Sequence, residues 1–161
     1  MPSELLSFGT ETSLPLSSIV LRLFVAMICG GAIGFEREWR SRAAGLRTHI
    51  LVCLSAAIVA LLTIEIVHYD IFQGEEVRMD PLRLIEAVTA GVAFLAAGMI
   101  VYSKGEVQGL TTGAGLWFAG SIGLACGLGF WQIGLIASTF ALVVLWLLHF
   151  VGAKLPNSDD T

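Results

Sequence analysis

The stretch IVLRLFVAMICGGAIGFERE, residues 19–38, decides the fold class. Its only charge before the closing Glu36, Arg37 and Glu38 is Arg22. An apolar run of about 18 residues or more is typical of a helix that crosses a lipid bilayer. No Lys or Arg precedes this run and no small-residue cleavage site follows it. We therefore expect a retained membrane helix rather than a signal peptide.

The composition points the same way for the whole chain. Of its 161 residues, 56% are hydrophobic and only 14% are charged, and the mean hydropathy is +0.83. A soluble protein of this size needs a polar shell that so few charges cannot form. The net charge of −4 argues against a nucleic-acid partner. Cys29, Cys53 and Cys126 lie inside apolar runs without metal-ligand spacing, so we expect packing roles for them and no cofactor.

The apolar runs predict an all-α polytopic membrane protein with five transmembrane helices. Each run is long enough for a hydrocarbon core of about 30 Å. The predicted spans are Ser18–Phe35, Ile50–Val67, Leu84–Tyr102, Leu110–Leu128 and Trp131–Val151. The membrane domain then covers residues 18–151, after an extracytoplasmic segment at residues 1–17 and before a short cytoplasmic tail at residues 152–161.

The distribution of Lys and Arg predicts the direction of insertion. With five spans, the connection around Arg40 shares one side of the membrane with Lys104 and Lys154. The opposite side receives an N-terminus without Lys or Arg and a connection, residues 68–83, that is mainly acidic. Because Lys and Arg accumulate in cytoplasmic loops, we expect a multi-pass protein with the N-terminus outside and the C-terminus in the cytoplasm.

Small residues predict how the helices pack, because lipid supplies no hydrophobic force between them. Pairs four residues apart occur in the first, third and fourth spans, and further small residues lie beside them. The candidate packing positions are Gly30, Gly34, Gly91, Ala93, Ala97, Gly98, Gly109, Thr111, Thr112, Gly113, Gly123 and Gly127. We expect the third and fourth spans to form a tight pair. These faces serve packing within one chain alone, or one of them also forms a homodimer.

Charges at membrane depth are costly unless they are paired, so each is a functional candidate. An outer group lies at similar predicted depth and comprises Arg22, Glu65, Arg83 and Glu86. Arg22 with Glu86 is the first pairing we expect. The group is either a structural ion-pair cluster or a polar entry or ligand site.

An inner group follows the first span. It comprises Glu36, Arg37, Glu38, Gly45, Arg47, Thr48 and His49. Gly45 permits a turn, and Glu36 is expected to pair with Arg47 or Lys104 at the inner boundary. Two interpretations stay open. The group is a positively charged anchor with internal salt bridges, or Glu36 and Glu38 hold a cation or face a partner protein.

Four stretches together resemble the MgtC/SapB family of bacterial membrane proteins. They are GGAIGFERE at residues 30–38, AGLRTH at 44–49, GVAFLAAG at 91–98 and GLTTGAGLW at 109–117. The family usually has glycine where this chain has Ala93 and Ala96, and commonly alanine where it has Gly113. The resemblance implies a five-span inner-membrane protein linked to growth at low magnesium and, in some pathogens, to survival inside host cells. For some members, modulation of the proton-driven ATP synthase is proposed. Those members also carry a soluble C-terminal regulatory domain, which we do not expect in this chain.

These observations support two main hypotheses of function. The first is a regulator or binding protein in magnesium-linked homeostasis that acts through contacts with itself or another membrane protein. The second is an ion or solute transporter or channel, formed by an oligomer, whose pathway uses the outer group and Glu36. Roughly 21 Å of helix separates Arg22 from Glu36 with few polar side chains between, which disfavours the second. We do not expect an enzyme, because no paired nucleophile and base and no metal triad is recognisable.

Overall fold

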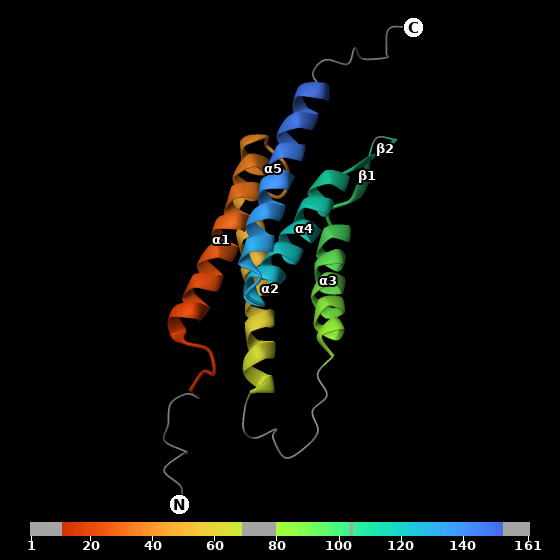
Figure 1. Cartoon of the computed structure of the whole chain (residues 1–161). Coiled ribbons are helices and arrows are strands. Elements are labelled where there is room, and N and C mark those ends of the chain that lie inside the picture. Colours follow the sequence, from red (N-terminus) through yellow and green to blue (C-terminus); the bar gives the residue numbers. More distant parts are fainter. Residues whose placement is uncertain (1–10, 69–79, 104, 153–161) are drawn as a thin grey trace, which may run out of the picture.

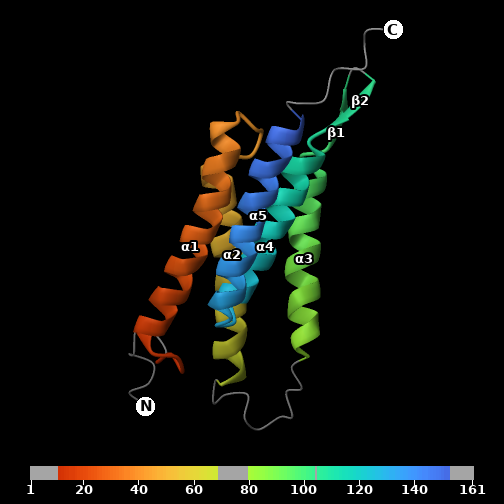
Figure 2. The same cartoon turned by 45° about the horizontal axis from the view of Figure 1, so that its top comes forward.

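The chain folds into a bundle of helices with one short hairpin. The computed structural model describes residues 11–68, 80–103 and 105–152. The elements are α1 (Leu16–Trp39), α2 (Leu46–Val67), α3 (Pro81–Ala97), β1 (Val101–Ser103), β2 (Glu106–Gln108), α4 (Leu110–Gly127) and α5 (Trp131–Gly152). Figure 1 shows the α1–α2 turn, the hairpin and the end of α5 at one end of the bundle, here called the hairpin end. The start of α1, the end of α2 and the start of α3 lie at the opposite end, and Figure 2 shows the same arrangement from another angle.

Helix α4 is the centre of the bundle, because it contacts each of the other four helices. Helix α2 packs mainly on α1 and α4, whereas α3 packs mainly on α4 and has little contact with α2. The largest buried cluster joins α1, α2 and α4 and is composed of small and medium apolar residues. Its members are Ala26, Cys29, Ile33, Cys53, Ala57, Ile122 and Cys126. The cysteines therefore contribute to packing, and all three are free thiols.

The outer surface of the bundle is apolar. Large hydrophobic side chains are exposed on every helix, for example Phe94 on α3 at 85% and Phe140 on α5 at 66%. Small residues inside and large apolar residues outside are the arrangement expected where the surroundings are themselves apolar. Helices α1 and α2 are each long and apolar enough to span a membrane, and α5 is apolar from Trp131 to Leu147.

Glycines allow α2 to approach both α1 and α4 closely. A Cβ atom at Gly34 of α1 would lie 2.8 Å from the Leu46 Cα, and one at Gly123 of α4 would collide with the carbonyl oxygen of Cys53. At Gly127, a Cβ would lie 2.8 Å from the Cα of Ala57. Helix α3 does pair with α4, as expected, and a Cβ at Gly113 would lie 3.1 Å from the carbonyl oxygen of Ala96, but helix α4 approaches the backbone of α2 more closely still.

The third predicted span was too long. Helix α3 begins with an Asp80 side chain that accepts a hydrogen bond from the Leu82 N–H at 2.9 Å, and it ends at Ala97 instead of reaching Tyr102. The apolar residues that follow form the antiparallel hairpin, in which Tyr102 pairs with Val107. Gly105, with a φ of +86°, provides the left-handed conformation of its turn. Hydropathy continued past Ala97, but the turn glycine made a hairpin the stable structure.

Candidate functional site

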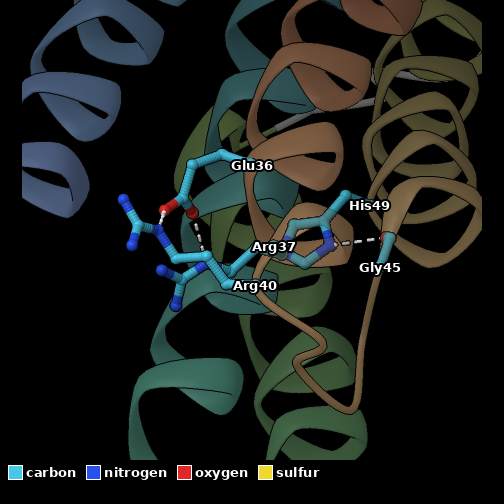
Figure 3. A network of polar contacts seen from close by, with 5 residues as sticks. All are labelled: Glu36, Arg37, Arg40, Gly45 and His49. Carbon is cyan, nitrogen blue, oxygen red and sulfur yellow. Dashed lines mark hydrogen bonds and ion pairs between the residues drawn. The ribbon is translucent and has the colours of Figure 1, made fainter. Parts of the chain in front are cut away.

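The inner group converges on Glu36, near the end of α1. Its carboxylate accepts a hydrogen bond at 2.7 Å from the Nε–H of Arg37 through one oxygen and another from the Nε–H of Arg40 through the other (Figure 3). Arg37 is only 3% exposed, which is unusual for a charged residue. The side chains of Glu36 and Arg40 retain 14% and 17% of their accessible surface. The result is a largely desolvated triad with two positive charges and one negative charge.

Glu38 has a different role, in the turn that joins α1 to α2. Its carboxylate accepts a hydrogen bond from the backbone N–H of Leu46 at 2.7 Å. Leu46 is the first residue of α2, whose N-terminal N–H groups have no partner within the helix. A negative charge there also interacts favourably with the helix dipole. Gly45 makes room for this contact, because a Cβ at that position would lie 2.7 Å from a Glu38 carboxylate oxygen.

His49 is the most buried polar side chain of the group, with no exposed surface. Its Nδ1 lies 2.9 Å from the carbonyl oxygen of Gly45. Since a carbonyl can only accept, Nδ1 carries the proton and Nε2 is left as an acceptor. Nε2 has no hydrogen-bond partner within the described residues. It lies 3.2 Å from where a Cβ of Gly115 on α4 would be, so the missing side chain of Gly115 makes room for the ring.

The expected pairing of Glu36 with Arg47 is wrong. Arg47 is exposed, Thr48 is half-buried, and within the described residues the ion pairs shorter than 4 Å are those of Glu36 with Arg37 and Arg40. Lys104, the other expected partner, lies outside the described residues. Arg40 was not among the predicted site residues, although its spacing of four residues from Glu36 on one helix is a recognised ion-pair signal.

The outer group does not form a cluster. The Nη1–H of Arg22 donates to the carbonyl oxygen of Gly127 at 2.9 Å, so the expected Arg22–Glu86 pair is absent from the described part of the chain. Glu65 accepts backbone hydrogen bonds from Ser13 at 2.6 Å and Leu14 at 3.1 Å. Arg83 and Glu86 are exposed on α3. Arg22 and Glu65 therefore bind backbone groups rather than the other charges of the group, and the predicted Arg22–Glu86 pairing fails because α1 and α3 lie on different sides of α4 (Figure 1).

The predicted packing residues divide into two sets. The first set faces other helices and consists of Gly30, Gly34, Thr112 and Gly113. Beside it, Gly109 precedes the first residue of α4 with a φ of +86°, and Thr111 is exposed. The second set is exposed on α3 or at its end and consists of Gly91, Ala93, Ala97 and Gly98. The residues of α3 that are buried against the bundle are instead Val88 and Ala96. The small-residue face of α3 thus points away from α4, which corrects the expected pairing through Ala93 and Ala97.

This geometry limits the chemistry of the site. Glu36 pairs with two guanidinium groups, which disfavours a cation at its carboxylate, and one oxygen of Glu38 is used as a helix cap. Across the three described ranges, no group of three His, Cys, Asp or Glu side chains could hold a metal ion. Within the same ranges, the site offers a cationic, partly desolvated surface at the hairpin end and one buried acceptor without a hydrogen-bond partner, His49 Nε2.

Comparison with known proteins gives a family and several relatives. The model of the MgtC family matches residues 23–154. "Putative magnesium transporter YhiD" of Escherichia coli strain K12 is 34% identical over 143 residues, which cover 89% of this chain and 66% of that protein. "Protein SapB" of Bacillus subtilis is 35% identical over 85% of this chain and 59% of its own length. "Protein MgtC" of Brucella abortus is 36% identical over 84% of this chain and 53% of its own length.

The chain thus spans between about half and two thirds of the length of these curated relatives. No solved structure matches it. The matched region, residues 23–154, includes the Glu36 triad, the Glu38 cap and His49.

Proposed function

Because the chain belongs to the MgtC family, we propose that it is a five-span inner-membrane protein that regulates or binds other membrane proteins in magnesium-linked homeostasis. The names of the Escherichia coli and Brucella relatives support the link to magnesium and to this family. In this proposal, contacts made by the membrane helices carry the activity, and no chemical reaction is catalysed.

The apolar interior of the bundle is the observation that carries this proposal. Between Arg22 and Glu36, the residues of α1 that are buried are Ala26, Cys29, Gly30, Ile33 and Gly34. They pack against equally apolar residues of α2 and α4. An ion crossing one copy at this place would lose its hydration without gaining polar ligands. A role in contact and regulation therefore fits a single copy better than conduction does.

The proposed topology places the hairpin end in the cytoplasm and residues 1–17 outside. In its favour, Arg37, Arg40, Arg42 and Arg47 all lie at or near the α1–α2 turn, at the same end as the hairpin and the end of α5 (Figure 1). We expect Arg42→Cys to be protected from an impermeant thiol reagent in intact cells and Thr12→Cys to react, in a chain with Cys29, Cys53 and Cys126 replaced. Both positions are exposed on the molecule. Labelling at position 42 with protection at position 12 would reverse the topology.

Partner contacts are proposed to use the exposed small-residue face of α3, either with a second copy as a homodimer or with another membrane protein. Gly91, Ala93 and Ala97 are exposed there, and a Cβ at Gly91 would meet no atom within 4 Å. Small residues at helix spacing let a second helix approach closely in lipid. Ala93→Cys should give a disulfide-linked dimer in membranes of a strain that expresses the cysteine-free chain. Arg83→Cys, at an exposed position two to three turns away on the same helix, is the matched control and should not give this dimer.

Transport is the second candidate, favoured by the name of the Escherichia coli relative, which refers to magnesium transport. It would require a pathway between copies, since the interior of one bundle is apolar. Purified protein in liposomes loaded with a magnesium-sensitive dye separates the two functions. Magnesium influx that depends on the protein and is lost in Glu36→Gln supports transport. No influx, together with rescue of growth at low magnesium by the same protein in cells, supports regulation.

A further inference from the structure

An open apolar groove runs between α1, α4 and α5 on the surface of the bundle. It encloses about 430 Å³ and is lined by Ile33, Thr111, Gly115, Phe118, Phe140 and Val144, among others. From Thr111 to Phe118 it extends roughly 10 Å along α4. This volume lies in the range of ~300–1,000 Å³ found for ligand sites. Its lining is almost wholly apolar, so a soluble polar ligand would find no partners in it.

The Glu36 triad lies directly beyond the groove on α1. Ile33 lines the groove, and Glu36 and Arg37 follow it three and four residues later, which places them on the same face about one turn nearer the hairpin end. Figure 3 shows both guanidinium groups on the side of α1 where the ribbon of α5 passes. The apolar groove therefore ends at two arginines.

Both arginines have hydrogen-bonding capacity left over. Each uses its Nε–H for the carboxylate of Glu36. Their terminal Nη groups donate no hydrogen bond to any described residue, although the Arg37 side chain retains only 4% of its accessible surface. Two guanidinium groups against one carboxylate leave one net positive charge. Guanidinium forks with free Nη–H groups match the oxygens of a phosphate.

We propose that this groove and the triad form a binding site for an anionic phospholipid. One acyl chain lies in the groove between α4 and α5, and the phosphate of the headgroup binds the Nη groups of Arg37 and Arg40. The charge of the triad, the free donors and the apolar groove that leads to them all fit this one ligand. The inference rests on the proposed membrane insertion and adds a specific ligand to it. Glu36 competes with the phosphate for the same guanidinium groups and so sets the affinity.

The test measures the unfolding temperature of the full chain in detergent with added phosphatidylglycerol or phosphatidylcholine. Phosphatidylglycerol near saturation should raise this temperature by about 5 °C more than phosphatidylcholine. Arg40→Gln should weaken phosphatidylglycerol binding about fivefold, while Arg42→Gln, an exposed arginine outside the triad, should leave it unchanged. Glu36→Gln should strengthen it, which a merely structural role of the triad would not do.

Variants of the groove test the acyl chain separately. Ala114 is exposed and lines the groove, so Ala114→Phe should reduce the effect of both lipids, whereas Val59→Phe, at an exposed position of α2 away from the groove, should reduce neither. Equal stabilisation by inorganic phosphate would show a free anion as the ligand and overturn the lipid site. Equal effects of the two lipids would overturn the headgroup site alone. Stabilisation by neither lipid would overturn the lipid site, whereas membrane insertion is tested separately by the thiol labelling at positions 12 and 42.

Discussion

The carboxylate of Glu38 caps the first turn of α2 by accepting a hydrogen bond from the Leu46 N–H at 2.7 Å. A side chain of one helix thus fixes the start of the next, and the α1–α2 turn is built around this contact. The cap also explains Gly45, whose missing side chain leaves the space in which the carboxylate lies.

Removing the cap should destabilise the protein moderately. We expect Glu38→Ala to lower the free energy of unfolding by about 1 kcal/mol, the usual cost of losing an N-terminal cap. Titration of the detergent-solubilised protein with dodecyl sulfate, followed by circular dichroism, measures it. Arg47→Ala, on the same turn of α2 but exposed, should change it by less than about 0.5 kcal/mol. Equal effects of the two substitutions would contradict the capping role.

Two glycine-to-alanine substitutions should change the free energy of unfolding in opposite directions. Gly123→Ala places a Cβ against the carbonyl oxygen of Cys53 and should cost roughly 2 kcal/mol or more of stability. Gly91→Ala meets no atom within 4 Å and should raise stability by about 0.5–1 kcal/mol through its better helix propensity. The same dodecyl sulfate titration compares them. A destabilising Gly91→Ala in the monomer would mean that this face of α3 is covered by part of the same chain.

The Glu36 triad should behave as one coupled unit. Arg37→Gln should cost about 2 kcal/mol, between the values for exposed and fully buried pairs, because it removes a buried partner of Glu36. Arg47→Gln should be nearly silent. In a double-mutant cycle, Arg37→Gln should cost clearly less when Glu36→Gln is already present. Additive losses would indicate that the two residues do not interact.

Substitution of His49 should impair function with little change in stability. His49→Leu removes the hydrogen bond to Gly45 but also the unsatisfied Nε2, so we expect a net change in stability below about 1 kcal/mol. A buried acceptor without a partner costs free energy, and its presence is explained if it meets a ligand or partner during function. Complementation of a low-magnesium growth defect should therefore fall in His49→Leu at an unchanged protein level. Full complementation would assign His49 to packing alone.

The sequence predicted the helices well and the pairing of charged side chains poorly. Long apolar runs placed α1, α2, α4 and α5 to within four residues at each end. The start of α3 depends on the Asp80 cap, and the hairpin after it depends on the left-handed conformation of Gly105, features for which hydropathy carries no signal. That Glu36, Arg37 and Glu38 belong to the inner group was predictable because they are adjacent in the chain, although Arg40 was missed. The partner of Glu36 was not, since Arg37, Arg40 and Arg47 are all near in sequence and only the rotation of α1 relative to α2 chooses among them.

The central position of α4 ties the assembly of the bundle to a late step of synthesis. Helix α3 has little contact with α2, and the face of α2 that carries Cys53 and Ala57 is covered by glycines of α4. While the ribosome has released only α1 to α3, therefore, α1 and α2 can pair, but α3 has almost no helix to pack against. A nascent chain stalled before Leu110 should remain open to lipid and to quality-control proteases, and release of α4 closes the structure.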